Sequence, residues 1–144
     1  MFVKADCVII ENADTNSKKM WCRGIRGATL ATSNTKEAIL EATKALLRKM
    51  IESNQIEKEA VACALFTATP DLNAEFPALA ARQMGWKGVP LLCAQELSVP
   101  NGLPGCIRVL ILLNTEKAAE DIKHVYIRGA EVLQEMPQSE EKSS

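Results

Sequence analysis

Four charged residues stand in apolar sequence frames, and their type and spacing could support chemistry. Arg108 interrupts the run CIRVLILL at 106–113, Glu96 follows Cys-Ala-Gln, Arg26 ends a short apolar segment, and Arg82 belongs to an alanine-rich one. The run around Arg108 predicts a buried β-strand. A guanidinium is always charged and carries five donors, so it must meet an anion there. That anion could be a carboxylate side chain or a ligand.

Two interpretations of these four residues remain open. In the first, Glu96 pairs with Arg108 inside the protein and the other charges are solvated, which for any single residue is the commoner arrangement. In the second, three arginines against one glutamate leave an excess of positive charge in an apolar cleft. Such a cleft would bind a small multi-anion, such as a dicarboxylate, through bidentate arginine contacts.

Residues for other kinds of catalysis do not occur in suitable patterns. The sequence has no glycine-rich phosphate loop, no G-x-S-x-G and no C-x-x-C, and it has one histidine, so no metal or cofactor is expected. His124 is interpreted as a structural residue, and Cys93 as a packing or hydrogen-bonding residue. The inventory suits a reaction that needs only positioning and electrostatic stabilisation.

Bulk composition predicts one globular domain. The 144 residues are 47% hydrophobic and 24% charged with a net charge of -1, which gives no field that would attract nucleic acid or an anionic membrane. No apolar stretch reaches transmembrane length, and the start is a poor signal peptide. Five cysteines, an odd number, are typical of reduced thiols in a cytoplasmic protein.

Hydrophobic periodicity predicts an α/β (α+β) domain with a mixed sheet, one long amphipathic helix and one short helix. Strands are expected over 23–29, 61–69, 89–97 and around Arg108, with an extended segment at 124–127. The long helix follows possible caps at 33–35, with Glu37, three residues after Asn34, helping the first turn, and runs about four turns. The short helix starts near Pro77. A turn or short helix is expected over 117–121. Residues 1–19 are predicted to be a flexible extension, 20–136 a single domain, and 137–144 a disordered tail.

Six sequence blocks occur in an order that resembles the AroH-class chorismate mutases, over about residues 21–136. The blocks are RGIRGAT at 23–29, TATPDL at 67–72, FPA at 76–78, VPLLCAQE at 89–96, CIRV at 106–109 and HVY at 124–126. Each block alone is weak, whereas six in order are specific.

This resemblance implies a fold, an assembly and a reaction. The fold is the small chorismate mutase/YjgF-like one, assembled as a homotrimer with a pseudo-α/β barrel and three active sites at subunit interfaces. The reaction is the Claisen rearrangement of chorismate to prephenate, towards phenylalanine and tyrosine. It is pericyclic and needs no base, nucleophile or metal.

The resemblance also assigns roles to individual residues. Arg108 would donate to the ether oxygen and a carboxylate, and Glu96 would accept from the ring hydroxyl. The remaining expected substrate-binding residues are Leu92, Cys93, Ala94 and Gln95 beside that hydroxyl, Arg26 and Tyr126 at the side-chain carboxylate, Phe76, Ala78 and Leu133 as apolar walls, and Arg82 near the mouth. Leu79 stands where family members can carry a lysine.

Two alternatives from other classes share parts of this pattern. An enamine/imine deaminase of the RidA type resembles the mutase in trimeric architecture and in the use of an interface arginine. The frames around Arg26, Glu96 and Tyr126 argue against it. A non-catalytic trimeric module that binds a small carboxylate would need the same arginines without turnover.

Overall fold

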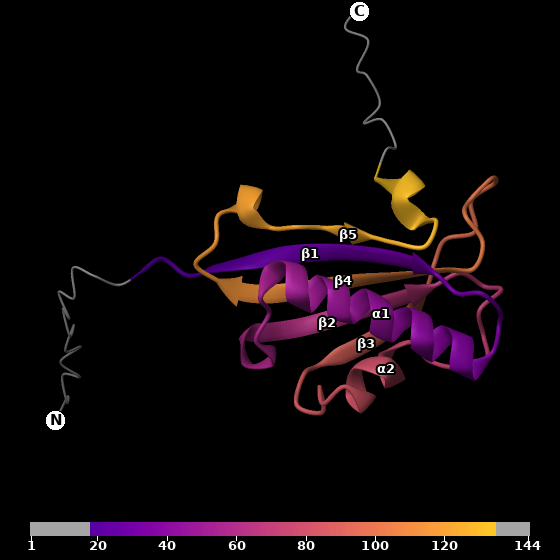
Figure 1. Cartoon of the computed structure of the whole chain (residues 1–144), viewed down its shortest axis with the longest axis horizontal. Helices are drawn as coiled ribbons and strands as arrows, with labels where there is room; N and C mark the ends of the chain where they lie inside the picture. Colours follow the sequence, from indigo (N-terminus) through magenta and orange to yellow (C-terminus); the bar gives the residue numbers. More distant parts are fainter. Residues whose placement is uncertain (1–17, 135–144) are drawn as a thin grey trace, which may run out of the picture.

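The computed structural model describes residues 18–134, which form a five-stranded mixed sheet with two α-helices on one of its faces (Figure 1). The predicted mixed α/β (α+β) class is confirmed. Apart from Lys18 and Lys19, the predicted extension at 1–19 and the predicted tail at 137–144 lie outside the described residues. The elements in order are β1 Trp21–Leu30, α1 Lys36–Asn54, the 3-10 turn η1 Lys58–Ala60, β2 Val61–Ala68, α2 Ala78–Gln83, β3 Leu91–Gln95, β4 Cys106–Thr115, η2 Ala119–Asp121, β5 Val125–Tyr126 and η3 Ala130–Leu133.

The sheet has the strand order β3-β2-β4-β1-β5, with β4 in its centre. β4 is antiparallel to both β1 and β2, whereas β5 runs parallel to β1 and β3 runs parallel to β2. The register sets Arg108 of β4 opposite Ala28 of β1 and opposite Thr67 of β2. Segments 80 and 41 residues apart in sequence therefore meet at the middle of the sheet.

Strand β4 is apolar on both faces, but only one face is covered by helix. Ile107, Val109, Ile111 and Leu113 are buried on the helix side, and the alternate residues point to the other face. The expectation that Arg108 is buried was wrong, because its side chain is 47% exposed in the single chain. A continuous apolar run is typical of a strand covered on both faces, and here the second face is open.

Helix α1 packs its apolar side along the sheet. Thr35 is its N-cap and its hydroxyl accepts a hydrogen bond from the Ala38 N–H at 3.2 Å. The cap thus lies within the predicted 33–35 and Glu37 lies in the first turn as predicted, while the side-chain Oδ1 of Asn34 accepts from the N–H groups of Asn73 and Ala74. Its 19 residues make about five turns rather than four. The buried residues include Ile39, Leu40, Leu46, Leu47 and Met50.

Gly27 lets α1 approach β1 closely. A Cβ atom at Gly27 would collide with the sulfur of Met50 and would lie 3.1 Å from Leu46 Cδ1. A larger residue would therefore force the helix away from the strand that carries Arg26. The glycine thus contributes to packing, on the face opposite to the charged side chains.

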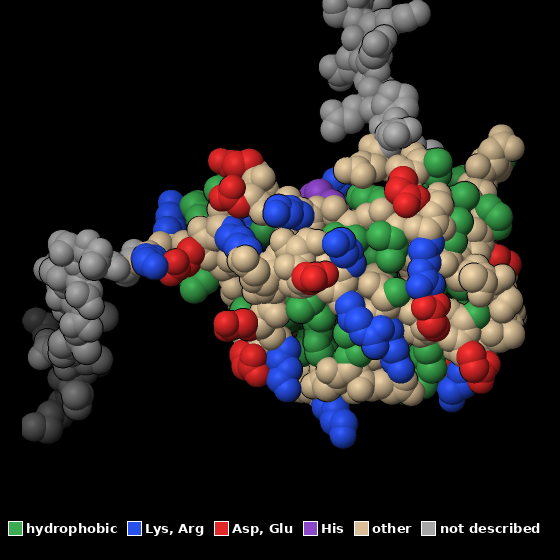
Figure 2. Space-filling model, viewed as in Figure 1, with side chains coloured by type: hydrophobic (Ala, Val, Ile, Leu, Met, Phe, Trp, Pro, Cys, Tyr) green, Lys and Arg blue, Asp and Glu red, His purple; other side chains and the backbone are tan. Residues whose placement is uncertain are grey.

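The helix-bearing face of the molecule carries basic and acidic side chains of both signs between small apolar areas (Figure 2). On α1 the exposed charges include Glu41, Arg48, Lys49 and Glu52. Neither sign dominates this face, so it presents no extended field to a charged partner. Among residues 18–134, none of the helices combines the length and the apolar character needed to cross a bilayer.

Candidate active site

A row of side chains crosses the open face of the sheet through all five strands. By strand register the row is Ala94, Thr67, Arg108, Ala28 and Tyr126, from β3 to β5. Residues opposite one another on neighbouring strands share a face, so these side chains lie side by side. Ala28 is short, which leaves space between the guanidinium of Arg108 and the Tyr126 side chain.

The next row on the same face places Arg26 near Arg108. Arg26 of β1 is opposite Leu110 of β4, which is opposite Leu65 of β2 and then Leu92 of β3. A cleft of about 340 Å³ opens between these two rows, around Arg26 and Arg108. Five of the sequence-predicted site residues line it: Arg26, Glu96, Arg108, Tyr126 and Leu133.

Glu96 is held against Arg108 inside this cleft. It follows the last residue of β3, and its N–H donates to the Ala68 carbonyl oxygen at 2.9 Å. The Thr67 hydroxyl donates to Glu96 Oε1 at 2.6 Å, and Arg108 Nε lies 3.3 Å from the same oxygen. No donor in residues 18–134 makes a hydrogen bond to Oε2. The internal pairing considered from the sequence is therefore present, and one carboxylate oxygen remains open to a ligand.

Arg26 brings a second positive charge to the cleft. It makes no ion pair with any carboxylate of residues 18–134, so the cleft holds two guanidinium groups against one carboxylate. The backbone N–H of Arg26 donates to His124 Nδ1 at 3.0 Å. Burial, and secondarily the charge of Arg26, lower the pKa of His124. The imidazole is therefore neutral, with its proton on Nε2, and it fixes β1 to the segment that carries Tyr126.

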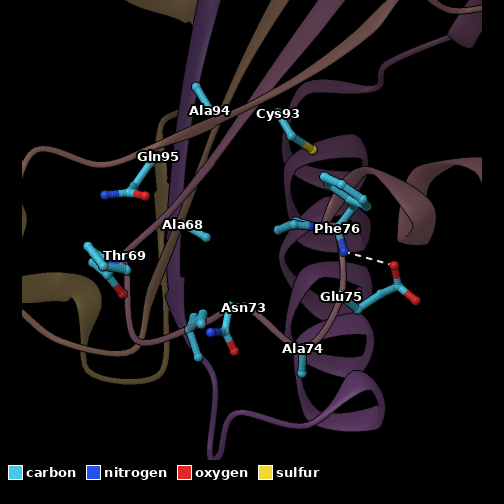
Figure 3. Close-up of a pocket in the computed structure, with 12 residues that line it drawn as sticks. Ala68, Thr69, Asn73, Ala74, Glu75, Phe76, Cys93, Ala94 and Gln95 are labelled. Atoms are coloured by element: carbon cyan, nitrogen blue, oxygen red, sulfur yellow. Dashed lines mark hydrogen bonds between the residues drawn. The ribbon is translucent and has the colours of Figure 1, made fainter.

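A second cavity of about 420 Å³ lies beside the edge strand β3 and is lined by some of the other predicted residues (Figure 3). Phe76, Cys93, Ala94 and Gln95 line it, and the Cys93 thiol is directed toward the side of the cavity that holds Phe76. The Phe76 N–H donates to Glu75 Oε1 at 2.9 Å, while the phenyl side chain is 69% exposed. The phenyl side chain is thus accessible at this cavity.

Three predicted residues line neither of these cavities. Ala78 is buried in α2, Arg82 is exposed on the same helix, and Leu92 is exposed on β3. A single chain therefore brings Arg26 and Arg108 to the cleft, and the third arginine of the expected cluster, Arg82, stays a prediction. Sequence spacing could not reveal the position of Arg82, because it does not show that α2 packs on the same face of the sheet as α1.

A third cavity, of about 400 Å³, shares Glu96 and Arg108 with the cleft and extends under the loop at 97–104. Its far wall is stabilised by Asp71, whose Oδ2 accepts from the Gly105 N–H at 2.7 Å. A hydrogen bond from Thr69 lowers the pKa of Asp71. The sequence analysis did not single out Thr67, Thr69 or Asp71 as site residues, although all three lie in the TATPDL block that supports the family resemblance.

The described cysteines, Cys22, Cys63, Cys93 and Cys106, are all free thiols. Burial raises the pKa of the Cys106 thiol despite the nearby guanidinium of Arg108, so this sulfur is a poor nucleophile. In residues 18–134 no three His, Cys, Asp or Glu side chains gather in a way that could hold a metal ion.

Known proteins resemble this chain over most of its length. The family model of chorismate mutase type I matches residues 22–136. The chorismate mutase AroH of Bacillus subtilis (strain 168) is 48% identical over 115 residues, covering 79% of this chain and 91% of that protein. The protein of the same name from Thermus thermophilus is 51% identical over 109 residues, covering 75% and 89%. A solved chorismate mutase from Clostridium thermocellum has a TM-score of 0.75 and 48% identity, covering 76% of this chain and 97% of that one.

Together with the mixed sheet and the cleft, these matches define the molecule as an isomerase. The chain belongs to the chorismate mutase type I family. Its reaction is the conversion of chorismate to prephenate, a step in aromatic amino acid biosynthesis.

Proposed function

We propose that the cleft between Arg26, Glu96 and Arg108 is where chorismate rearranges, and that the side chains act by electrostatic stabilisation alone. As the ether C–O bond breaks, negative charge develops on the ether oxygen and positive charge on the ring. Arg108 donates to that oxygen, while Glu96 accepts from the ring hydroxyl through its open Oε2 and faces the positive ring. Arg26 and Tyr126 bind the side-chain carboxylate.

The size of the effects supports this mechanism. A rate gain of about a millionfold corresponds to about 8 kcal/mol of barrier. Loss of one preorganised donor costs roughly 3 to 4 kcal/mol. Arg108 is preorganised because its Nε already lies 3.3 Å from Glu96 Oε1, so little reorganisation is needed when substrate enters. The single observation that carries the proposal is that two arginines and one glutamate from three separate sequence blocks meet in one cleft.

The assembly that we propose is a homotrimer with each active site at a subunit interface. The predicted site residues divide between two separate cavities of one protomer, one at Arg108 and one at Phe76. The face between them exposes Leu92 and leaves Leu65, Leu110 and Leu112 only partly buried. A contiguous apolar surface of this kind suits burial against another copy. Such burial would bring the Phe76 cavity of one protomer to the Arg108 cleft of the next.

The activity is tested by following the loss of chorismate absorbance with purified protein and no added cofactor, with an imine substrate assayed in parallel. Conversion of chorismate to prephenate supports the mutase mechanism. Turnover of the imine alone would support a deaminase, and chorismate binding without conversion would support a non-catalytic module.

The composite site is tested by mixing two inactive variants, Arg108→Ala and Phe76→Asp, after dissociation and reassembly. In a random 1:1 mixture about one quarter of the interfaces of a cyclic trimer combine an intact Arg108 with an intact Phe76 from the neighbouring protomer. Recovery of about a quarter of the wild-type activity supports interface sites. No recovery, with sedimentation showing mixed trimers, would place the whole site within one protomer.

A cytoplasmic location is supported by the free state of Cys22, Cys63, Cys93 and Cys106. Alkylation of the protein taken directly from cells, without reductant, should modify the accessible thiols. Disulfide-linked peptides in the same digest would contradict this location.

A further inference from the structure

A bidentate ion pair fastens the segment after β5 to helix α1. Arg128 Nη1 donates to Glu41 Oε2 at 2.6 Å, and Nη2 donates to Glu41 Oε1 at 2.7 Å. Parallel two-point contacts between guanidinium and carboxylate are the strongest and most directional form of this interaction. The hydrogen bond from Arg128 lowers the pKa of Glu41, so both groups are charged at neutral pH.

The backbone at Arg128 departs from ordinary geometry. Arg128 has φ 56° and Gly129 has φ 94°, so two consecutive left-handed residues turn the chain out of β5 and into η3. Glycine takes this conformation freely, whereas a residue with a long side chain rarely does. The ion pair supplies a compensating interaction that is specific to this position.

Two side chains that flank this turn line the cleft. Tyr126 precedes Arg128 by two residues and Leu133 follows in η3, and both line the cleft that contains Arg108. The segment after β5 is also held by a hydrogen bond of 3.1 Å from the Ile127 N–H to the Ala28 carbonyl oxygen, and by the buried methyl group of Ala130. Neither Arg128 nor Glu41 lines the cleft.

We propose that Arg128 and Glu41 are positioning residues that hold Tyr126 and Leu133 in place for substrate binding. The proposal rests on the proposed function of the cleft. Glu41 belongs to α1, on the helix-covered side of the sheet, and acts through Arg128 without touching the substrate. Loss of the ion pair lets the turn open, and an open turn removes a carboxylate contact and an apolar wall from the cleft.

The test compares Glu41→Gln with Glu52→Gln, an identical change at another exposed position of α1 that forms no ion pair in the described part of the chain. The pair is partly exposed, with side chains 36% and 61% accessible, so its removal should raise the KM for chorismate about three- to fivefold. The kcat should change little, because contacts equal in ground and transition states act on KM. Glu52→Gln should leave both constants unchanged.

Hydrogen exchange provides a readout that does not depend on catalysis. The N–H of Ala130 donates to the Ile127 carbonyl oxygen, and the N–H of Gln134 donates to the Glu131 carbonyl oxygen. Both amides should exchange about three- to fivefold faster in Glu41→Gln and at wild-type rates in Glu52→Gln. Arg128→Gln and the double variant should match Glu41→Gln in KM and in exchange, because the two residues act as one unit.

The proposal is overturned if Glu41→Gln matches Glu52→Gln in both KM and exchange, or if the effects of the two single changes multiply in the double variant. Failure of the proposed function would be distinct: wild-type protein would then not convert chorismate, while the exchange rates would still report whether the ion pair holds the turn.

Discussion

The same apolar strands form both faces of the five-stranded sheet, but the two faces differ in what covers them. The face under α1 is sealed by residues such as Ile111 and Phe66, which are fully buried. The opposite face carries Arg26, Arg108 and Tyr126 among leucines that remain partly exposed. Each strand contributes to both faces, because neighbouring residues of a strand point to opposite sides of the sheet. One face therefore supplies the stability of the protomer, and the other supplies the charges and a surface suited to assembly.

The largest expected effect is on the open face, at Arg108. Arg108→Ala should lower kcat/KM by at least about a hundredfold, since a lost preorganised donor costs about 3 kcal/mol or more, while the melting temperature changes little. The measurement is chorismate turnover together with thermal unfolding. Arg48→Ala, at an exposed position of α1, is the matched control. Retention of more than about a tenth of wild-type activity would disprove the role of Arg108.

On the covered face, Ile111→Ala should cost stability. The side chain is fully buried against α1, and truncation of a buried isoleucine to alanine loses about 2 to 5 kcal/mol. Urea unfolding measures this loss. Asn114→Ala, at an exposed position of the same strand, should change the unfolding free energy by less than about 0.5 kcal/mol. Equal losses at both positions would contradict the difference between the faces.

Thr67 tests how far the open face is preorganised. Thr67→Val removes the hydroxyl that donates to Glu96 Oε1 at 2.6 Å, and a hydrogen bond to a charged group contributes about 1.5 kcal/mol or more. We expect kcat/KM to fall about tenfold, measured by chorismate turnover. Thr32→Val, at an exposed position outside the site, should be neutral. An unchanged rate for Thr67→Val would show that Glu96 does not need this anchor.

Thr29 provides the converse test on the covered face. Its buried hydroxyl oxygen has no hydrogen-bond partner among the residues that the structure describes. Thr29→Val should therefore raise the unfolding free energy by about 1 kcal/mol. Thr43→Val should lower it, because the Thr43 hydroxyl donates to the Ile39 carbonyl oxygen at 2.7 Å. Equal signs for the two variants, measured by urea unfolding, would contradict this assignment.

The smallest expected effect is a pH dependence at His124. Its pKa is lowered in the folded protein from an ordinary value of 6.5, so its contribution to stability is full above that value and is lost as the pH falls toward the folded pKa. The unfolding free energy of the wild type relative to His124→Asn should therefore decrease between about pH 7.5 and about pH 5.5. A difference that does not change with pH would mean that the hydrogen bond to Arg26 tolerates the charged ring.

The sequence predicted the elements, and five of the residues that it singled out line one cleft. It failed where the environment of a residue depended on which other elements cover it. Periodicity identified α1 and the four longer strands, and six motif blocks identified the family. Periodicity could not show that β4 is covered on one face only, so Arg108 was placed in a buried environment. The ion pair between Arg128 and Glu41 joins residues 87 apart, and no local pattern signals it.

The central position of β4 in the sheet also sets the earliest stage of chain synthesis at which the site can begin to form. Strand β4 ends at Thr115 and lies between β1 and β2, so those two strands have no shared neighbour until about four-fifths of the chain has been synthesised. Pairings between such distant segments are slow to close. During synthesis, β1 and β2 therefore present unpaired edges, which are prone to aggregation. The same late event, insertion of β4, pairs the facing edges of β1 and β2 and brings Arg108 between Thr67 and Ala28, whereas the cleft is complete only after β5 and η3 have added Tyr126 and Leu133.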